Sequence, residues 1–413
     1  MPGPPDRIAM HGSVAVIFNR FGPYHLARLR AAAARMRIIG IEVFGKDKTY
    51  GWEVVRGDEP FRRVTLFETQ GDHIRRSQVQ RAITELLERE RPSAVAMPGW
   101  SSREALSALS WCLRFSVPAI LMTDSQRHDR GRNPLGEGVK QRVVPLYSAA
   151  LVAGTTQMQY TADLGMDRNR IYCGYDVLDN EHFRSGAAQA RADASLRARL
   201  GLPPRYFLTC CRFIWQKNLP RLLEAYGRYC VSSPEPWGLV LLGDGPLRAQ
   251  VEGAIHRRGL GSRVLTPGFV QYDALPAYYG LAEAAILASV SETWGLTVNE
   301  GMAAGLPVLV SSRCGCARDL VEEGRNGFTF DPYDVEALSH LMLRLSSAFE
   351  DQRQAMGRAS QEIIGRWTPV LFADNLEKAI ETARSLPQPS LSVLDRALIW
   401  LLIHRPTFVN PRS

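Results

Sequence analysis

The sequence lacks the marks of a disulfide-rich, zinc-stabilised or membrane-spanning protein. Its seven cysteines are an odd number spread over 413 residues, and no C-x-x-C pair occurs. This spacing argues against a disulfide framework or a structural zinc site. No apolar run approaches the roughly 20 residues that a transmembrane helix requires. No D-x-D motif, short-period repeat or low-complexity tract is present either. We therefore expect reduced, mostly buried thiols in a globular chain.

The first residues also lack the apolar core of a secretory signal peptide. Met1 to Gly12 contains prolines and charged residues instead. Such a segment is unlike a signal peptide, so we expect a cytoplasmic protein.

The composition is that of an ordinary globular protein, with 45% hydrophobic, 22% charged and 9% aromatic residues. A single hydrophobic core rarely grows beyond about 250–300 residues, so this length predicts two domains. Fifty Lys and Arg against 42 Asp and Glu give a formal charge of +8. That excess favours anionic partners such as phosphates, nucleic acid or a membrane surface without selecting one.

Short apolar runs alternate with longer amphipathic stretches along most of the chain, which is the pattern of parallel α/β units. The stretch 185–204 is rich in Ala, Arg, Gly and Pro and is typical of a domain junction. We predict an α/β fold of two facing, doubly wound Rossmann-like domains with a cleft between them. The strands are expected at 14–18, 38–44, 94–97, 119–122, 150–152, 206–211, 238–242, 264–265, 284–288 and 307–310.

The predicted domains are residues 1–190 and 191–366, followed by C-terminal helices in 367–413. The last of these helices, over Ser392–Ile403, is the more apolar one. Two interpretations stay open for it. Either it packs back on the N-terminal domain, or it lies in the plane of a membrane surface with Arg396, His404 and Arg405 at the headgroups.

The most informative stretch runs from Ser291 to Glu300. It follows an apolar strand and leads into a helix of small residues. Glu300 stands there among apolar neighbours, and a buried carboxylate is costly unless it accepts hydrogen bonds. The vicinal hydroxyls of a sugar would supply two donors. A helix that begins near Gly295 offers free N–H groups and a positive dipole end to a diphosphate.

A second cluster follows the strand 206–211 and contains Arg212 and Lys217. Ligands of open α/β sheets bind outside the carboxyl ends of the strands, so both cations can reach a diphosphate there. Gly243–Gly245 and Gly268–Val270 follow the next two strands. The loops that carry these charged residues and glycines in the predicted C-terminal domain are thus expected at one edge of its sheet.

These motifs occur in the order found in a known enzyme family. The ordered set resembles the retaining glycosyltransferases of the GT-B fold, family 4, with their E-x7-E signature. The resemblance is dense over roughly residues 205–335 and loose in the N-terminal half. It rests on Arg212 with Lys217, Gly243–Gly245, Gly268–Val270, Glu292 with Glu300, Gly305–Pro307 and Asn326–Phe328.

The resemblance implies an activity. A hexosyl group would move from a nucleotide-diphosphate sugar to an acceptor hydroxyl, with retention at the anomeric carbon. The products would be glycolipids, polysaccharides or other glycoconjugates.

It also implies roles for single residues. Arg212 and Lys217 would neutralise the departing diphosphate, and Glu292 would face the transferred sugar. Glu300 would hold the ribose hydroxyls of the nucleotide. The remaining donor-binding candidates are Gly22, Gly243, Phe269, Val270, Trp294, Gly295, Leu296 and Thr297.

The sequence departs from the family on the acceptor side. Many members carry a histidine just after the fifth N-terminal strand, where this chain has Asp124, with His128 four residues later. His25, on the first helix, either faces the acceptor or is an exposed or capping histidine. These three residues are the acceptor-side candidates.

The expected chemistry needs no cofactor. No second carboxylate is placed as a nucleophile, so a front-face substitution fits, with rate enhancement from positioning and fixed charges. Because no D-x-D motif occurs, we expect no requirement for a divalent metal.

Basic residues crowd two segments of the N-terminal half. They indicate either an anionic or lipid-linked acceptor bound by this domain, or simple solubility. Nucleic acid is not expected, because no stacking aromatics are interleaved with them. If the acceptor is lipid-linked, the protein would sit peripherally at the inner face of the membrane. The residues are Arg20, Arg28, Arg30, Arg35, Arg37, Arg127, Arg130, Arg132, Lys140 and Arg142.

Two other functions are compatible with the same fold. One is a regulatory module that binds a nucleotide sugar without turnover, and the other is a GT-B sugar-nucleotide epimerase. The presence of Arg212, Lys217, Glu292 and Glu300 together favours the transferase.

Overall fold

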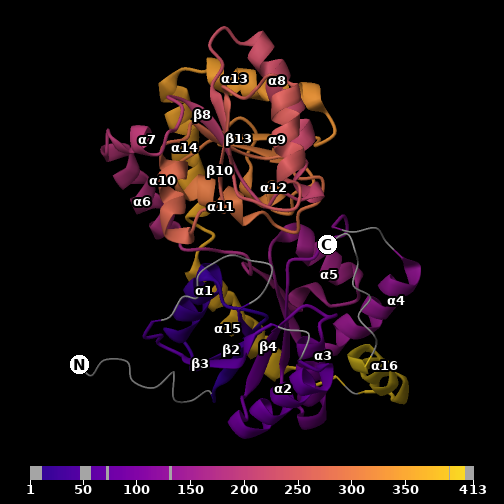
Figure 1. Cartoon of the computed structure of the whole chain (residues 1–413). Helices are drawn as coiled ribbons and strands as arrows, with labels where there is room; N and C mark the ends of the chain where they lie inside the picture. The colour runs from indigo at the N-terminus through magenta and orange to yellow at the C-terminus, as the bar shows by residue number, and fades with distance from the viewer. Residues whose placement is uncertain (1–11, 47–56, 71–73, 130–132, 390, 405–413) are drawn as a thin grey trace, which may run out of the picture.

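The computed structural model describes residues 12–46, 57–70, 74–129, 133–389 and 391–404. Most of the segment Met1 to Gly12 and three of the basic residues named from the sequence (Arg130, Arg132 and Arg405) lie outside these ranges. Within them the chain forms two α/β domains, one above the other in Figure 1. Each domain is built on its own parallel sheet.

The N-terminal sheet has the strand order β3-β2-β1-β4-β5-β6-β7 in the described part of the chain. Its central strands are continuous apolar runs because helices cover both of its faces. The strands are β1 (Val14–Phe18), β2 (Ile38–Lys46), β3 (Arg62–Thr69), β4 (Ala94–Pro98), β5 (Ala119–Thr123), β6 (Ala149–Val152) and β7 (Ile171–Cys173). The helices among them are α1 (Pro23–Ala33), α2 (Arg76–Glu90), α3 (Arg103–Phe115), α4 (Pro134–Val143) and α5 (Thr155–Asp163).

The C-terminal sheet has the order β10-β9-β8-β11-β12-β13. Its strands are β8 (Tyr206–Cys210), β9 (Gly238–Leu242), β10 (Val264–Gly268), β11 (Ala284–Leu287), β12 (Val308–Ser311) and β13 (Gly327–Phe330). The helices of this domain are α6 (Asn180–Ala192), α7 (Leu196–Arg199), α8 (Leu219–Ser232), α9 (Arg248–Arg257), α10 (Leu275–Gly280), α11 (Leu296–Ala303), α12 (Ala317–Leu320), α13 (Val335–Ser347) and α14 (Glu350–Ile364).

The chain crosses between the domains twice. The first crossing lies between β7 and α6, because α6 already packs against α10 and α11 of the second domain. The segment 185–204, expected as the junction, therefore contains the end of α6 and all of α7. Helix α6 buries one apolar face, at Phe183, Ala187 and Ala190. Because this helical spacing shows no strand pattern, the stretch resembles a linker in the sequence.

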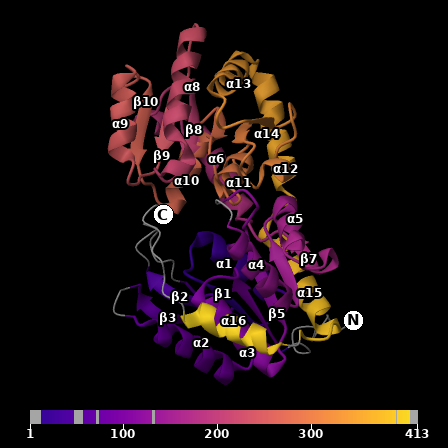
Figure 2. The ribbon, with the colours of Figure 1, turned by 90° about the vertical axis from the view of Figure 1, so that its right-hand side faces the viewer.

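After α14 the chain returns to the N-terminal domain in two helices. Helix α15 (Pro369–Ser385) buries Phe372, Leu376 and Ile380 in the core on one face of the N-terminal sheet. Helix α16 (Val393–His404) packs against α3 and α4 on the opposite side. Figure 2 shows α16, in yellow, lying across the outside of this domain.

Helix α16 is apolar on two sides. Ile399, Leu402 and Ile403 are buried in the N-terminal core. Trp400 and Leu401, between them in sequence, are 62% and 58% exposed. In the residues described, no helix is both long and apolar enough to cross a membrane.

All ten strands expected from the sequence are present, within a few residues of their predicted bounds. The strands that the sequence did not reveal are β3, β7 and β13, and each lies at the edge of a sheet. Edge strands are half-exposed or short, so they lack the apolar run that marks a central parallel strand. The side chains of β3, for example, range from partly buried to exposed.

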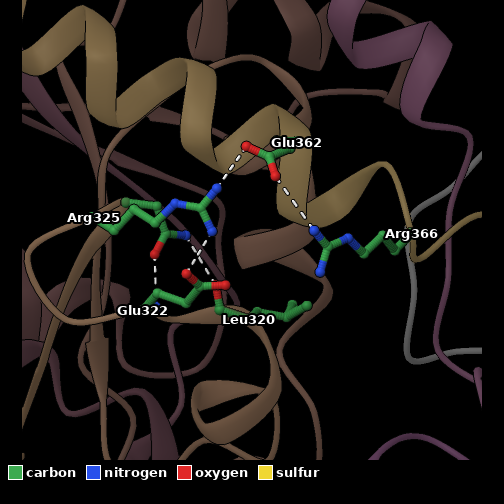
Figure 3. Close-up of polar contacts among 6 residues, drawn as sticks. Leu320, Glu322, Arg325, Glu362 and Arg366 are labelled. Carbon is green, nitrogen blue, oxygen red and sulfur yellow. Dashed lines mark hydrogen bonds and ion pairs between the residues drawn. The ribbon is translucent and has the colours of Figure 1, made fainter.

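The Asn326-Gly327-Phe328 motif supports the fold rather than the chemistry. The Asn326 side chain is buried, donates to the carbonyl of Leu320 (2.9 Å) and accepts from the N–H of Glu322 (2.8 Å). It thereby closes the turn before β13. Beside it, Arg325 forms ion pairs with Glu322 and Glu362 on the surface (Figure 3).

Candidate active site

The sequence candidates lie in loops at the carboxyl ends of the strands and in the helices that follow, and the charged donor-side candidates lie where the strand order of the C-terminal sheet reverses. In the C-terminal sheet the order turns between β8 and β11, and ligands of doubly wound sheets bind at such a switch point. We call the loops that follow β8, β9, β10 and β11, together with α11, the C-terminal wall. The N-terminal sheet turns between β1 and β4. We call the start of α1, the loop after β5 and the start of α5 the N-terminal wall.

Glu300 is the most deeply buried of the predicted charged site residues, with 1% of its surface exposed. It lies in α11, and both of its carboxylate oxygens accept hydrogen bonds from tyrosine hydroxyls. Tyr279 of α10 donates to Oε2 (2.5 Å) and Tyr24 of α1 donates to Oε1 (2.6 Å). Burial raises the pKa of Glu300 to about 7, although the two hydroxyls pull it down. The second donor comes from the other domain.

Glu292 and Lys217 form an ion pair at the carboxyl ends of β11 and β8. The hydroxyl of Ser289 also donates to Glu292 Oε2 (3.1 Å). Burial alone lowers the pKa of Lys217, but the Glu292 carboxylate outweighs it and the net pKa is raised. Lys217 therefore stays charged, and its charge is already matched by one carboxylate.

Two glycines of the C-terminal wall allow backbone geometry that other residues resist. Gly243, after β9, has φ of +131°, and a Cβ there would lie 2.0 Å from the carbonyl oxygen of Cys211. Gly295 has φ of +112° and begins α11. Both positions favour glycine strongly. Arg212 lies on the loop after β8, between Cys211 and the turn that carries Lys217.

The other donor-side candidates lie along the same wall. Phe269 follows β10 and is 44% exposed, whereas Val270 is partly buried against the domain core. Leu296 and Thr297 form the first turn of α11. The Trp294 side chain is buried, donates to Asn299 and packs on Trp367 near the second crossing. Only the backbone of Trp294 is therefore available to a ligand.

The acceptor-side candidates are placed differently from one another. His25 Nδ1 accepts from the N–H of Gly22 (3.0 Å) and so caps α1. Burial, together with Arg28 and Arg20, lowers the pKa of His25 to about 3, so the ring is neutral. Asp124 contacts the C-terminal wall through Thr293. His128 is exposed on the following loop.

Three side chains of the N-terminal wall hold the loop that carries Glu292. Asp124 Oδ2 accepts from the hydroxyl of Thr293 (2.7 Å). Gln126 donates to the carbonyl of Glu292 (2.6 Å), and Gln157 donates to the carbonyl of Thr293 (2.5 Å). Burial raises the pKa of Asp124 above its ordinary value. The two domains are thus in direct contact at the site.

Sequence patterns do not single out Tyr24, Tyr279, Gln126 or Gln157. Tyr24 stands two residues after the glycine loop, and Gln126 two residues after Asp124. Closeness in sequence to a predicted site residue is the signal that could have pointed to Tyr24 and Gln126. The glutamine contacts are to backbone carbonyls, which exist at every residue, so their partners leave no trace in the sequence.

Six of the ten basic residues named from the N-terminal half form ion pairs with acidic side chains. Arg28 is buried in an ion pair with Asp176 (3.0 Å). Five others form ion pairs with acidic neighbours, which leaves less charge for an anionic ligand than the sequence suggested. These are Arg30, Arg35, Arg127, Lys140 and Arg142.

The cysteines are free thiols, as expected from their number and spacing. Cys314 and Cys316 are buried beside the Glu292 loop, and burial raises the pKa of both. Between them, Gly315 leaves room for the carbonyl of Thr293, which lies 2.0 Å from the place a Cβ would take. This segment therefore shapes the loop.

Comparison with known proteins gives a family match within the C-terminal domain. Residues 194–363 match the family described as glycosyl transferases group 1. Alpha-D-kanosaminyltransferase of Streptomyces kanamyceticus is 27% identical over 248 residues, which cover 55% of this chain and 61% of that protein. The chain thus spans less than two thirds of the length of this relative.

Solved structures match over nearly the whole chain. Sucrose-phosphate synthase of Thermosynechococcus elongatus has a TM-score of 0.72 at 17% identity, over 91% of this chain and 99% of its own. The HepE protein of Anabaena, solved with UDP and glucose, has a TM-score of 0.69 at 16% identity, over 91% and 100%. The fold is therefore GT-B, as the sequence predicted. The stretch that matches the glycosyl transferases group 1 model, residues 194–363, lies within the C-terminal domain.

Proposed function

We propose that this protein is a retaining glycosyltransferase that moves a hexosyl group from a nucleotide-diphosphate sugar to an acceptor hydroxyl. The observation that carries the proposal is Glu300, a buried carboxylate at the switch point whose two oxygens accept bonds from hydroxyl groups. A ribose hydroxyl is a donor of the same kind. The charges of Lys217 and Arg212 on the neighbouring loop suit a diphosphate. The family match of the C-terminal domain and the nucleotide bound to a structural relative support the same donor class.

The proposed reaction is a front-face displacement. The bond from the anomeric carbon to the phosphate oxygen breaks while a bond to the acceptor oxygen forms on the same face. The acceptor proton passes to the departing phosphate oxygen. Arg212 and Lys217 stabilise the charge that develops on the diphosphate, and Glu292 lies at the sugar end, where its pairing with Lys217 makes it a poor nucleophile.

The donor is tested first by thermal shift. A nucleotide sugar that binds only the folded protein raises its melting temperature by mass action. We expect one base and one sugar in a panel of UDP-, GDP-, ADP- and TDP-sugars to give the largest shift. Absence of a shift with every member would contradict the proposal.

Turnover then separates the transferase from the two alternatives. A transferase releases nucleoside diphosphate only when an acceptor is present, and NMR of the product shows the anomeric configuration of the donor. A regulatory module would bind the donor without any product. An epimerase would convert the donor sugar with no acceptor added. An inverted product would contradict retention.

For the acceptor we infer a neutral hydroxyl compound or glycan in place of a strongly anionic one. The ion pairs within the N-terminal domain, such as Arg28 with Asp176, support this choice. Initial rates with matched neutral and phosphorylated acceptors test it. A clear preference for the phosphorylated acceptor would restore the anionic alternative.

We further propose that α16 rests on a membrane surface while its other side packs on the domain. Trp400 and Leu401 are exposed beside the basic Arg396, a combination that suits the boundary of headgroups and acyl chains. The one acid of this helix, Asp395, is paired with Arg142. Such contact would bring the site close to a lipid-linked acceptor on the cytoplasmic face.

Vesicle sedimentation tests this contact. We expect the protein to bind vesicles of phosphatidylcholine with phosphatidylglycerol, and a double change of Trp400→Ser and Leu401→Ser to abolish binding. Phe349→Ser is the matched control, since Phe349 is 76% exposed on the C-terminal domain. Equal sedimentation of all three proteins would exclude α16 as the contact.

A further inference from the structure

The carboxylate of Glu300 has two tyrosine partners that belong to different domains. Tyr279 is 1% exposed and lies in the core of the C-terminal domain, and Glu300, also 1% exposed, belongs to the same domain. Tyr24 belongs to α1, and it reaches across the interface to pack on that same core. Its ring meets Tyr272 edge-on, at 5.5 Å between centroids and 82° between planes. One hydroxyl is thus fixed to the carboxylate's own domain, and the other moves with the opposite domain.

Glu300 has no exposed surface left for a third partner. Its exposed fraction is 1% with Tyr24 in place, so a ligand can reach the carboxylate only if a neighbour moves away. Tyr279 cannot leave without opening the core of its domain. Tyr24 can leave with α1, since its hydroxyl bond to Oε1 (2.6 Å) joins two separate domains.

We propose that the Tyr24 hydroxyl occupies, in the ligand-free protein, the place at Glu300 that a ribose hydroxyl of the donor takes. Tyr24, from the acceptor-side domain, then occupies part of the donor site until the donor displaces its hydroxyl. Donor binding exchanges one hydroxyl for another on the same carboxylate oxygen, and it releases α1 from the C-terminal domain at this point. This inference rests on the proposed function.

The exchange predicts an unusual direction of effect for a substitution. Tyr24→Phe removes the competing hydroxyl, so the free protein holds a buried carboxylate with one partner fewer, while the complex is unchanged. The nucleotide should therefore bind more tightly, by roughly tenfold for a bond to a charged acceptor. Tyr279→Phe is the matched control, because it removes the same group from the other oxygen. The donor does not replace Tyr279, so this variant should bind no more tightly than the unchanged protein.

The experiment is calorimetric titration of UDP, GDP and ADP into the full-length protein and both variants. A second set uses the 2′,3′-dideoxy form of whichever nucleotide binds, which lacks the two ribose hydroxyls. We expect the gain of Tyr24→Phe to appear with the ribonucleotide and to vanish with the dideoxy form. Circular dichroism melting confirms that each variant is folded.

The outcomes distinguish a failure of the Tyr24 exchange from a failure of the proposed function. A nucleotide that binds the unchanged protein and Tyr24→Phe with equal dissociation constants overturns the exchange and leaves the proposed function intact. Equal gains with the ribonucleotide and the dideoxy form also overturn it, because the hydroxyl would then compete elsewhere. If no nucleotide binds any of the three proteins, the proposed function fails and this inference fails with it.

Discussion

The two walls of the site differ in what they contact. The C-terminal wall holds charged groups in self-contained pairs, such as Glu292 with Lys217. The N-terminal wall contributes side chains that hold the other wall's backbone, as Gln126 does at the carbonyl of Glu292. One wall therefore carries the charged candidates, and the other holds the loop on which one of them lies. Asp124 and Tyr24 differ from the glutamines, because they contact side chains: Asp124 accepts from the hydroxyl of Thr293, and Tyr24 donates to the carboxylate of Glu300.

The largest effect should come from removing a cation of the C-terminal wall. With Arg212→Ala we expect the turnover number to fall by a factor of about 100–1,000, because a fixed charge at a developing anion contributes roughly 3–4 kcal/mol to barrier lowering. Steady-state kinetics with the identified donor measure it. Arg228→Ala is the control, since Arg228 lies on the exposed surface of α8. A variant that keeps its full rate would take Arg212 out of the reaction.

The next effect should appear in donor affinity instead of rate. Glu300→Gln keeps the shape of the side chain but replaces one acceptor oxygen by an amide donor. Hydrogen bonds to charged groups contribute about 1.5–3 kcal/mol, so the dissociation constant of the nucleotide should rise by roughly 10–100-fold. Calorimetric titration measures this constant. An unchanged value would mean that the ribose does not reach Glu300.

The same difference between the walls explains what the sequence can reveal. The C-terminal wall combines charged residues, glycines and strand ends in a fixed order, so the sequence pattern alone is enough to select Arg212, Lys217, Glu292 and Glu300 as candidates. Gly243 carries its own signal, because its positive φ and the close carbonyl of Cys211 admit little else. Each of these positions has a local physical reason that shows in the residue type.

The N-terminal wall carries weaker signals. Gln157 matters because it donates to a main-chain carbonyl 136 positions away, and no residue type marks such a partner. Asp124 is marked in the sequence only by a departure from a family pattern. The ion pair of Arg28 with Asp176 depends on the crossing between β7 and α6, and the composition of the chain places that crossing too late. Contacts between domains depend on how two independent folds meet, and the local pattern contains no record of that.

A third effect should depend on pH. Burial raises the pKa of Glu300 to about 7, so the carboxyl becomes protonated as the pH falls through 7. The protonated form has lost an acceptor, and nucleotide affinity should then fall by up to about tenfold per pH unit. Above pH 8 the affinity should be constant.

Glu300→Gln provides the control for this titration. Its affinity should stay nearly flat between pH 8 and pH 6, because the amide does not titrate. Asp176, whose pKa burial also raises to about 7, titrates in both proteins and cancels in the comparison. The same pH profile in both proteins would place the titrating group elsewhere.

A smaller effect on kcat/KM is expected from removing a hydrogen bond between the N-terminal wall and the Glu292 loop. Gln126→Ala removes the bonds to the carbonyls of Glu292 (2.6 Å) and Arg313 (3.1 Å). Each such bond contributes about 0.5–1.5 kcal/mol, a factor of roughly 2–13 per bond, so kcat/KM should fall by less than with Arg212→Ala. Gln189→Ala, on the exposed side of α6, is the control. A loss as large as that of Arg212→Ala would mean that this wall takes part in the chemistry and not only in closure.

The smallest expected effect is that of a chelator, which we expect to leave the activity unchanged. Arg212 and Lys217 place two cationic side chains on the loop after β8, of which Lys217 is paired with Glu292, and the sequence has no D-x-D motif to hold a divalent ion. We propose that these cations do the work that a metal does in other transferases, so activity should be unchanged in excess EDTA. Initial rates before and after addition of the chelator measure this. Loss of activity that magnesium or manganese restores would move the stabilising charge from the two side chains to an ion, and Arg212→Ala should then cost far less than a hundredfold in turnover.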